Sequence, residues 1–228
     1  MEQQDTIGTK KFLSGRSVAL GIIAVLIMYV LFDLFIPMHR DLRSFDPNEM
    51  ARLETAMWES YYDRKPVKIY FELAEMLRSQ FHFPFLRSFV GAYHAAHAAF
   101  VFKDHTNDND LHRAETILLS YFSLIRKTGN IEFDVQRAAE LELRWWIVHR
   151  ERTKYSEDQL AAACANAAAT LYQVSSESTT EHGYLRAQAM TIRDTKAKEG
   201  GVREEDWRTI EELLKGCYRS LYGAIQQR

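Results

Sequence analysis

Two predicted helices carry histidine and carboxylate side chains that could hold a metal ion. His94 and His97 are three residues apart, so they share a face of one helix. Glu142 and His149 are seven residues apart and share a face of another. Imidazole nitrogens and carboxylate oxygens suit iron, manganese or zinc. These four residues define one hypothesis, a membrane-bound oxidoreductase with a carboxylate and histidine di-metal site that binds iron or manganese.

The spacing of these residues counts against the metal site. With Glu54 or Glu59 as a further ligand, the site would resemble that of ferritin-like di-iron proteins, which use Glu-x-x-His twice. This chain contains no Glu-x-x-His. Glu142 and His149 also lie about 10 Å apart along the helix axis, too far to hold one ion by themselves. The metal site therefore remains the alternative, and neither a metal nor a cofactor is expected.

The favoured interpretation makes Glu142 and His149 structural polar groups. A buried carboxylate without a partner costs several kcal/mol by order of magnitude, so a donor from another helix must face it. The sequence offers several donors without choosing among them, namely Arg78, Arg137, His94 and His97. A ligand pocket of unknown kind is a third interpretation.

Two adjacent tryptophans extend this predicted network. Trp145 and Trp146 lie on the same helix as Glu142, and their indole N–H groups need acceptors when buried. The predicted structural network comprises Glu142, His149, Trp145, Trp146 and Arg78.

No motif in the chain identifies an enzyme class. Gly-x-Ser-x-Gly, the phosphate-binding Gly-x-x-x-x-Gly-Lys-Ser/Thr, Gly-x-Gly-x-x-Gly and His-Glu-x-x-His are all missing, so no catalytic residue is predicted and cofactor-binding residues stay undetermined. Cys164, in an alanine-rich segment, is expected in the core, and no pairing with Cys217 can be argued. The net charge of -2, spread along the chain, argues against a nucleic-acid partner.

Residues 18–36 are apolar except for Asp33 and predict a single transmembrane helix. A cleaved signal peptide is the alternative, but the run ends in IPMHRD, which offers no small-x-small cleavage site. The predicted divisions are a tail at 1–17, the span at 18–36, a polar linker at 37–46 and a soluble domain at 47–228.

The charges that flank the span bear on orientation. Lys10, Lys11 and Arg16 precede it, and Arg40 and Arg43 follow it. The slight basic excess before the span favours a soluble domain on the non-cytoplasmic side.

Beyond residue 46 the chain shows helical spacing throughout. The chain is poor in residues that break helices, with 10 Gly and 4 Pro, which favours long helices. Apolar stripes, caps and breakers predict about eight antiparallel helices, near residues 47–63, 67–81, 84–102, 110–128, 132–153, 156–174, 180–198 and 204–225. The fold class is therefore all-α, with one transmembrane helix before a helical domain.

Alanine-rich segments at 92–100 and 161–172 would let neighbouring helices approach closely. In this the chain resembles the tetratricopeptide-like helical-hairpin superfamily in style, although no single repeat carries the full consensus. The resemblance covers about residues 47–226 and transfers no functional residue. An open hairpin array and a compact bundle both remain possible.

These observations favour a membrane-anchored helical scaffold or accessory subunit for protein–protein interaction or complex assembly. Its expected partners are membrane lipid and other proteins, with a subunit of a larger membrane complex as a special case. The di-metal oxidoreductase is the alternative.

Overall fold

The structure is a computed structural model in which residues 15–227 are described. Within that range it holds nine helices and no strand, which confirms the all-α prediction. The chain divides into two units, Met1–Ile36 and Pro37–Arg228, and we treat each by itself. Lys10 and Lys11 of the predicted tail lie outside the described residues.

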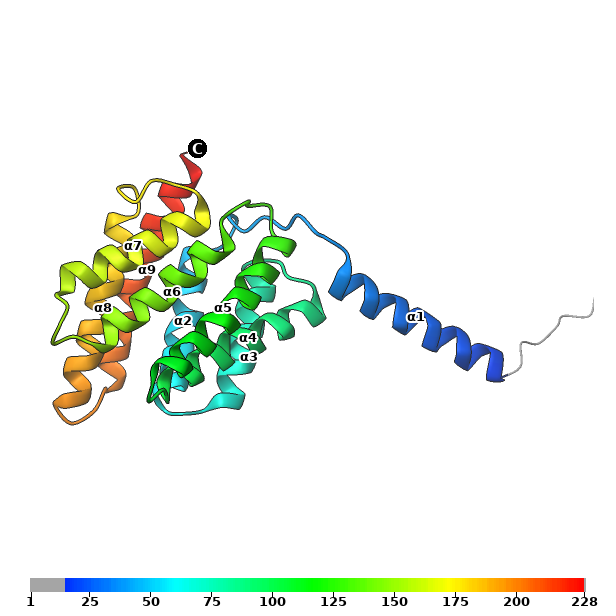
Figure 1. The fold of residues 1–228 in the computed structure, drawn as a ribbon, viewed down its shortest axis with the longest axis horizontal. Helices are drawn as coiled ribbons and strands as arrows, with labels where there is room; N and C mark the ends of the chain where they lie inside the picture. Colours follow the sequence, from blue (N-terminus) through cyan, green and yellow to red (C-terminus); the bar gives the residue numbers. More distant parts are fainter. Residues whose placement is uncertain (1–14, 228) are drawn as a thin grey trace, which may run out of the picture. The chain divides into compact units, whose positions relative to one another are not determined.

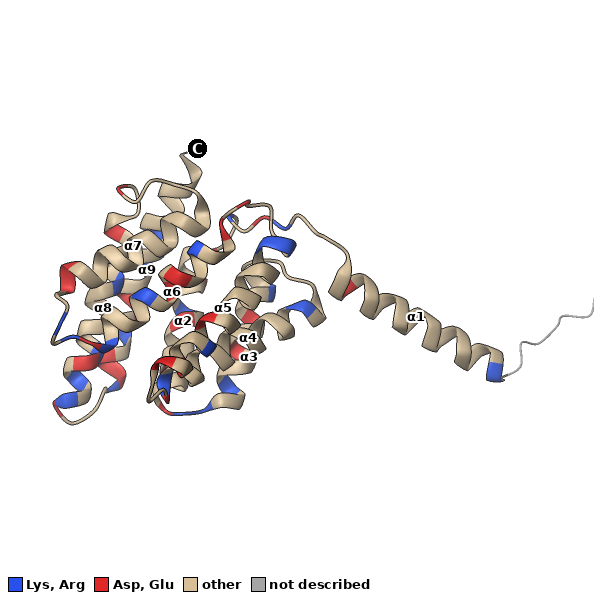
Figure 2. Ribbon diagram, viewed as in Figure 1, with Lys and Arg blue, Asp and Glu red and all other residues tan. Residues whose placement is uncertain are grey.

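Helix α1, Gly15–Phe35, is the helix of the first unit. Arg16 and Asp33 are its only charged residues, whereas charged residues are spread over the helices of the second unit (Figure 2). At about 1.5 Å per residue its 21 residues reach roughly 31 Å, close to the thickness of a bilayer's hydrocarbon core. The helix is therefore long and apolar enough to cross a membrane. A signal sequence near an N-terminus has the same two properties.

The second unit contains eight helices among the described residues, as the sequence predicts (Figure 1). They are α2 Pro47–Tyr62, α3 Pro66–Ser79, α4 Phe85–Lys103, α5 Asp108–Thr128, α6 Val135–Arg150, α7 Glu157–Tyr172, α8 Thr180–Lys198 and α9 Glu204–Gln226. Local chemistry sets several of their ends. The Asp46 carboxylate accepts the backbone N–H groups at the start of α2, and Ser156 with Gln159 forms the predicted capping box of α7.

Each of these helices packs against the next one in the chain, and α9 returns to pack against α2. The series of contacts therefore closes on itself, which decides between the two predicted arrangements in favour of a compact bundle. One large core cluster runs through the unit, from Leu42 and Phe45 before α2 to Ile225 in α9.

A close approach of α8 to α7 depends on a glycine. A Cβ at Gly183 of α8 would lie 2.2 Å from the Ala161 carbonyl oxygen and 2.9 Å from the backbone nitrogen of Ala165 in α7. Only a residue without a side chain fits between these two backbones.

Residues 37–46, predicted as a polar linker, instead form part of the helical domain. The Met38 and Arg40 backbone N–H groups donate to the carbonyl oxygens of Lys127 and Thr128, at 3.3 and 2.9 Å. Leu42 and Phe45 are the two apolar side chains in RDLRSFDPNE, and both are buried. Their burial outweighs the polar character of the rest of the segment.

Candidate functional site

A carboxylate buried between three helices is the centre of the candidate site. Glu54 of α2 is 2% exposed. Arg186 of α8 donates to both of its oxygens, with Nη1 2.9 Å from Oε2 and Nη2 bonded to Oε1. The Tyr218 hydroxyl of α9 donates to Oε2 at 2.5 Å, and the Trp58 indole donates to Oε1 at 3.1 Å. Both oxygens of Glu54 are therefore satisfied.

Glu54 and Arg186 each stabilise the charged form of the other. Burial by itself would raise the pKa of Glu54, but the charge of Arg186 and the hydrogen bonds from Arg186 and Tyr218 lower that pKa overall. Burial likewise opposes the charge on Arg186, yet Glu54 holds the pKa of Arg186 well above its ordinary value. The pair is therefore ionised at neutral pH.

Arg186 also connects this centre to the predicted network of α6. Its guanidinium carbon lies 5.3 Å from the centre of a Trp145 ring and 5.7 Å from that of Trp58, within range of cation–π attraction. Next to it, Glu142 accepts a hydrogen bond from the Trp146 indole at 3.1 Å. Burial raises the pKa of Glu142, although both indoles and the charge of Arg186 oppose that rise.

The same region holds both cysteines as buried thiols. The His182 imidazole nitrogen Nδ1 lies 3.0 Å from the Cys217 sulfur and 3.2 Å from its carbonyl oxygen. Burial lowers the pKa of His182 to about 4 and raises that of Cys164 to about 12. Burial also raises the pKa of Cys217. The neutral imidazole and the protonated thiols are a packing arrangement, since a reactive cysteine requires a thiolate.

A second polar cluster joins the C-terminal half of α6 to α8. His149 Nε2 lies 3.0 Å from one carboxylate oxygen of Asp194, and Arg193 pairs with the other oxygen at 2.9 Å. Burial would raise the pKa of Asp194, but His149 and Arg193 lower it overall. Asp194 is therefore the charged partner that faces His149.

The other residues singled out in the sequence lie elsewhere. Arg78, one of the candidate donors of the predicted network, is exposed and lies over the Phe85 ring. Arg137 pairs with Glu140, and His97 faces Arg113.

The alternative metal site is not assembled. Within residues 15–227, no group of three or more His, Cys, Asp or Glu side chains could hold a metal ion. Among the described residues, His94, His97, Glu142 and His149 therefore do not form such a group.

Sequence reasoning did not identify the centre of the network. Glu54 entered only as a further ligand for the metal site, and Arg186 and Tyr218 were not singled out. One signal was present, because Glu54 lies four residues from both Met50 and Trp58 and so interrupts the buried face of α2. A charge at such a position requires a buried partner.

The surface offers a long hollow beside α7, α8 and α9. Its first part, of about 470 Å³, lies between α7 and α8 on a floor that includes Ala161, Ala162 and Ala165, with Asp158 at its edge. Tyr184, 45% exposed, lines the same hollow.

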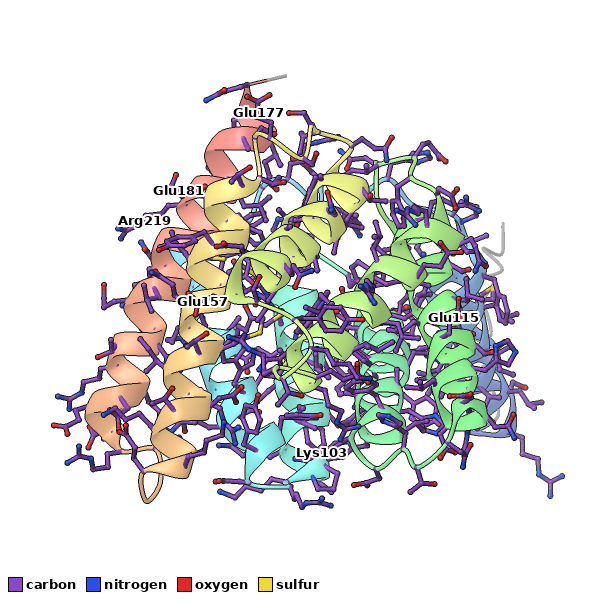
Figure 3. All side chains as sticks on the ribbon, turned by 60° about the vertical axis from the view of Figure 1, so that its left-hand side comes forward. Lys103, Glu115, Glu157, Glu177, Glu181 and Arg219 are labelled. Carbon is purple, nitrogen blue, oxygen red and sulfur yellow. The ribbon has the colours of Figure 1, made fainter. Side chains whose placement is uncertain are left out.

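The second part of the hollow shares Tyr184 and Glu177 with the first and extends along α8 and α9. Glu177, Glu181 and Arg219 lie along this edge of the domain (Figure 3). The Arg219 guanidinium donates two hydrogen bonds to the Asn48 side chain, at 3.1 and 2.7 Å. The lining of the hollow therefore combines alanine side chains and the Tyr184 ring with three carboxylates and one guanidinium, and it is net acidic.

No family model matches this chain, and no match to it was found among curated proteins or solved structures.

Proposed function

We propose that this chain is a membrane-anchored helical domain that binds a protein partner, as a scaffold or as an accessory subunit. Helix α1 would remain attached as the anchor. The domain would lie on the non-cytoplasmic side, because Lys10, Lys11 and Arg16 precede the span and only two basic residues of this kind, Arg40 and Arg43, closely follow it.

The hollow beside α7 and α8 is the observation that carries this proposal. Asp158, Glu177 and Glu181 give the lining of the hollow three carboxylates against one cation, Arg219, so the lining carries a net negative charge. A lining of this charge favours a basic partner segment, because complementary charges orient and accelerate association. The alanine floor and the exposed Tyr184 ring would contact apolar side chains of that segment.

The polar network supports this role by joining the helices behind the hollow. Arg186 belongs to the same helix as Tyr184, and it ties α8 to α2 through Glu54. A surface held on rigid elements binds with less loss of conformational entropy than a mobile one.

Crosslinking in membranes of the native cell tests the proposal. A photoreactive amino acid at position 184 of the full chain should give a discrete adduct with one partner. The same group at position 208 of α9, where the Arg208 side chain is 75% exposed, is the matched control. Glu177→Lys with Glu181→Lys should reduce the adduct about tenfold, the equivalent of roughly 1.4 kcal/mol of binding free energy.

Two outcomes would contradict the proposal. Recovery of the protein alone, with no adduct at position 184, would show that no partner binds at the hollow. An intact mass that lacks residues 1–36 would show that α1 is a cleaved signal sequence and would remove the anchor.

A further inference from the structure

An aromatic surface on α3 and α4 stands out from the rest of the helical domain. Among the described residues after Ile36, six large apolar side chains are exposed, and five of them belong to these two helices. With the half-buried Phe89 they form what we call the aromatic face, which consists of Val67, Phe71, Phe85, Phe89, Val90 and Tyr93.

The rings of this face are in contact with one another. The Phe89 ring centre lies 5.1 Å from that of Phe85 and 6.1 Å from that of Phe71. Phe85, Phe89 and Tyr93 follow at intervals of four, so they form one stripe along α4. The face is therefore a continuous apolar surface, and surfaces of this kind mark contacts with proteins or membranes.

Core packing accounts for Phe89 but not for the five exposed residues of this face. A separate cluster of Ile69, Leu73, Ala74, Ala92 and Ala96 already fills the interface between the two helices. The hairpin therefore has apolar side chains on its exposed surface in addition to those between its two helices.

The charges around the aromatic face are balanced. Lys68 pairs with Glu72 at 3.4 Å, and the Arg78 guanidinium lies 5.8 Å from the centre of the Phe85 ring. Glu75 is also exposed on α3. Phenylalanine side chains near the long side chains of Lys and Arg are typical of helices that lie in the interface of a membrane.

Residues 37–46, through which the chain enters the domain, contact the loop that precedes this face. Within the domain, Ser44 contacts His82 at 3.3 Å, and the Asp46 backbone N–H donates to the Gln80 side chain at 3.0 Å. The loop that contains Gln80 and His82 leads directly into Phe85. Met38 is already bonded into the domain, and a chain of two residues from Ile36 spans about 7 Å at most. A membrane anchor at α1 would hold this end of the domain at the bilayer surface.

We propose that the aromatic face inserts into the headgroup layer of the bilayer that α1 spans. The inference rests on the proposed anchor but is independent of the hollow beside α7 and α8. The tether makes the bilayer the nearest partner for this surface, and the balanced charge means that zwitterionic lipid suffices.

Spin labels on the full chain in phosphatidylcholine vesicles test this inference. Labels at Phe71→Cys and Tyr93→Cys would be compared with one at Arg208→Cys on α9. Cys164 and Cys217 are buried and stay unlabelled in the folded protein. The ratio of collisions with oxygen, which concentrates in lipid, to collisions with a water-soluble nickel chelate should be at least threefold higher at positions 71 and 93 than at 208.

Three results would overturn the inference in different ways. Equal ratios at positions 71, 93 and 208 would place the face in water. A ratio that falls when the protein is diluted in lipid would assign the face to a second copy of the chain. A label at Val25→Cys that collides freely with the nickel chelate would show that α1 does not span the bilayer. Failure of the anchor is thus distinguished from failure of the aromatic face.

Discussion

Arg186 of α8 binds the carboxylate of Glu54 of α2 through both terminal nitrogens of its guanidinium, across 132 residues of sequence. The Glu54 side chain is 3% exposed and that of Arg186 is 14% exposed, so water contributes little to either charge. Tyr218 of α9 completes the arrangement. The pair therefore fixes the place where the last helices of the domain meet the first.

Removal of one partner should be severe. In Glu54→Ala the Arg186 charge stays buried without its carboxylate, and we expect the free energy of unfolding to fall by about 3–5 kcal/mol. Urea unfolding of the full chain in mild detergent, followed by tryptophan fluorescence, measures the change.

A matched pair on the surface provides the control. Glu204 and Arg208 are also bonded, at 2.5 Å, but their side chains are 82% and 75% exposed. Glu204→Ala should leave the unfolding midpoint unchanged, because solvent screens such pairs. If Glu54→Ala also left the unfolding midpoint unchanged, the buried pair would have no structural role.

The buried imidazole of His182 should make stability depend on pH. Burial lowers its pKa from 6.5 to about 4, so between these values the unfolded chain binds a proton that the folded chain does not. Stability should fall as the pH drops from about 6.5 to about 4, by up to roughly 3 kcal/mol, and this contribution should be constant above pH 6.5. Unfolding measured across this pH range checks the prediction.

Two substitutions test whether His182 is the cause. In His182→Gln the loss between pH 6.5 and 4 should shrink, whatever the variant's stability at neutral pH. In His112→Gln it should persist, because the His112 side chain is 82% exposed. An unchanged pH profile in His182→Gln would assign the effect to other groups.

Gly183 and Gly223 lie in neighbouring helices, and the same change should act on them in opposite directions. Gly183→Ala would force a Cβ against the backbone of α7, and we expect a loss of about 1–3 kcal/mol. Gly223→Ala meets no atom within 4 Å, so it should gain up to about 1 kcal/mol from helix propensity. Thermal unfolding by circular dichroism compares the two. Equal effects would mean that α7 and α8 do not pack closely at Gly183.

The helices of this domain were predictable because their signals are local. Asp46 with Pro47 marks the start of α2, and Ser156 with Gln159 marks that of α7, within a few residues in each case. Closure of the bundle was not predictable, because it depends on long-range contacts such as Glu54 with Arg186. The docking of residues 37–46 was missed because two apolar side chains, Leu42 and Phe45, are too few to form a periodic pattern.

The candidate site shows the same division between local and distant information. Helical spacing places Glu142 and His149 on one face, and the Trp146 donor lies within the same turn. Asp194, which faces His149, is 45 residues away, and no local feature distinguishes it from other carboxylates. Spacing within one helix cannot specify which side chain of another helix approaches it, and for that reason the sequence could not choose among the candidate donors to Glu142.

Glu142 is the one member of the network whose charge should oppose folding. Burial is the largest cause of the raised pKa of Glu142 in the folded protein. At low pH the carboxyl group is protonated in both the folded and the unfolded protein. As the pH rises through the folded pKa, ionisation favours the unfolded protein and stability is lost. Glu142→Gln keeps an oxygen for the Trp146 indole and removes the charge. We therefore expect it to raise the unfolding midpoint at pH 8 and to give no gain at pH 4. Glu140→Gln, at a side chain 41% exposed, should show no such pH-dependent gain. If Glu142→Gln instead lowered stability relative to the parent, and did so more at pH 8 than at pH 4, Arg186 would depend on both carboxylates.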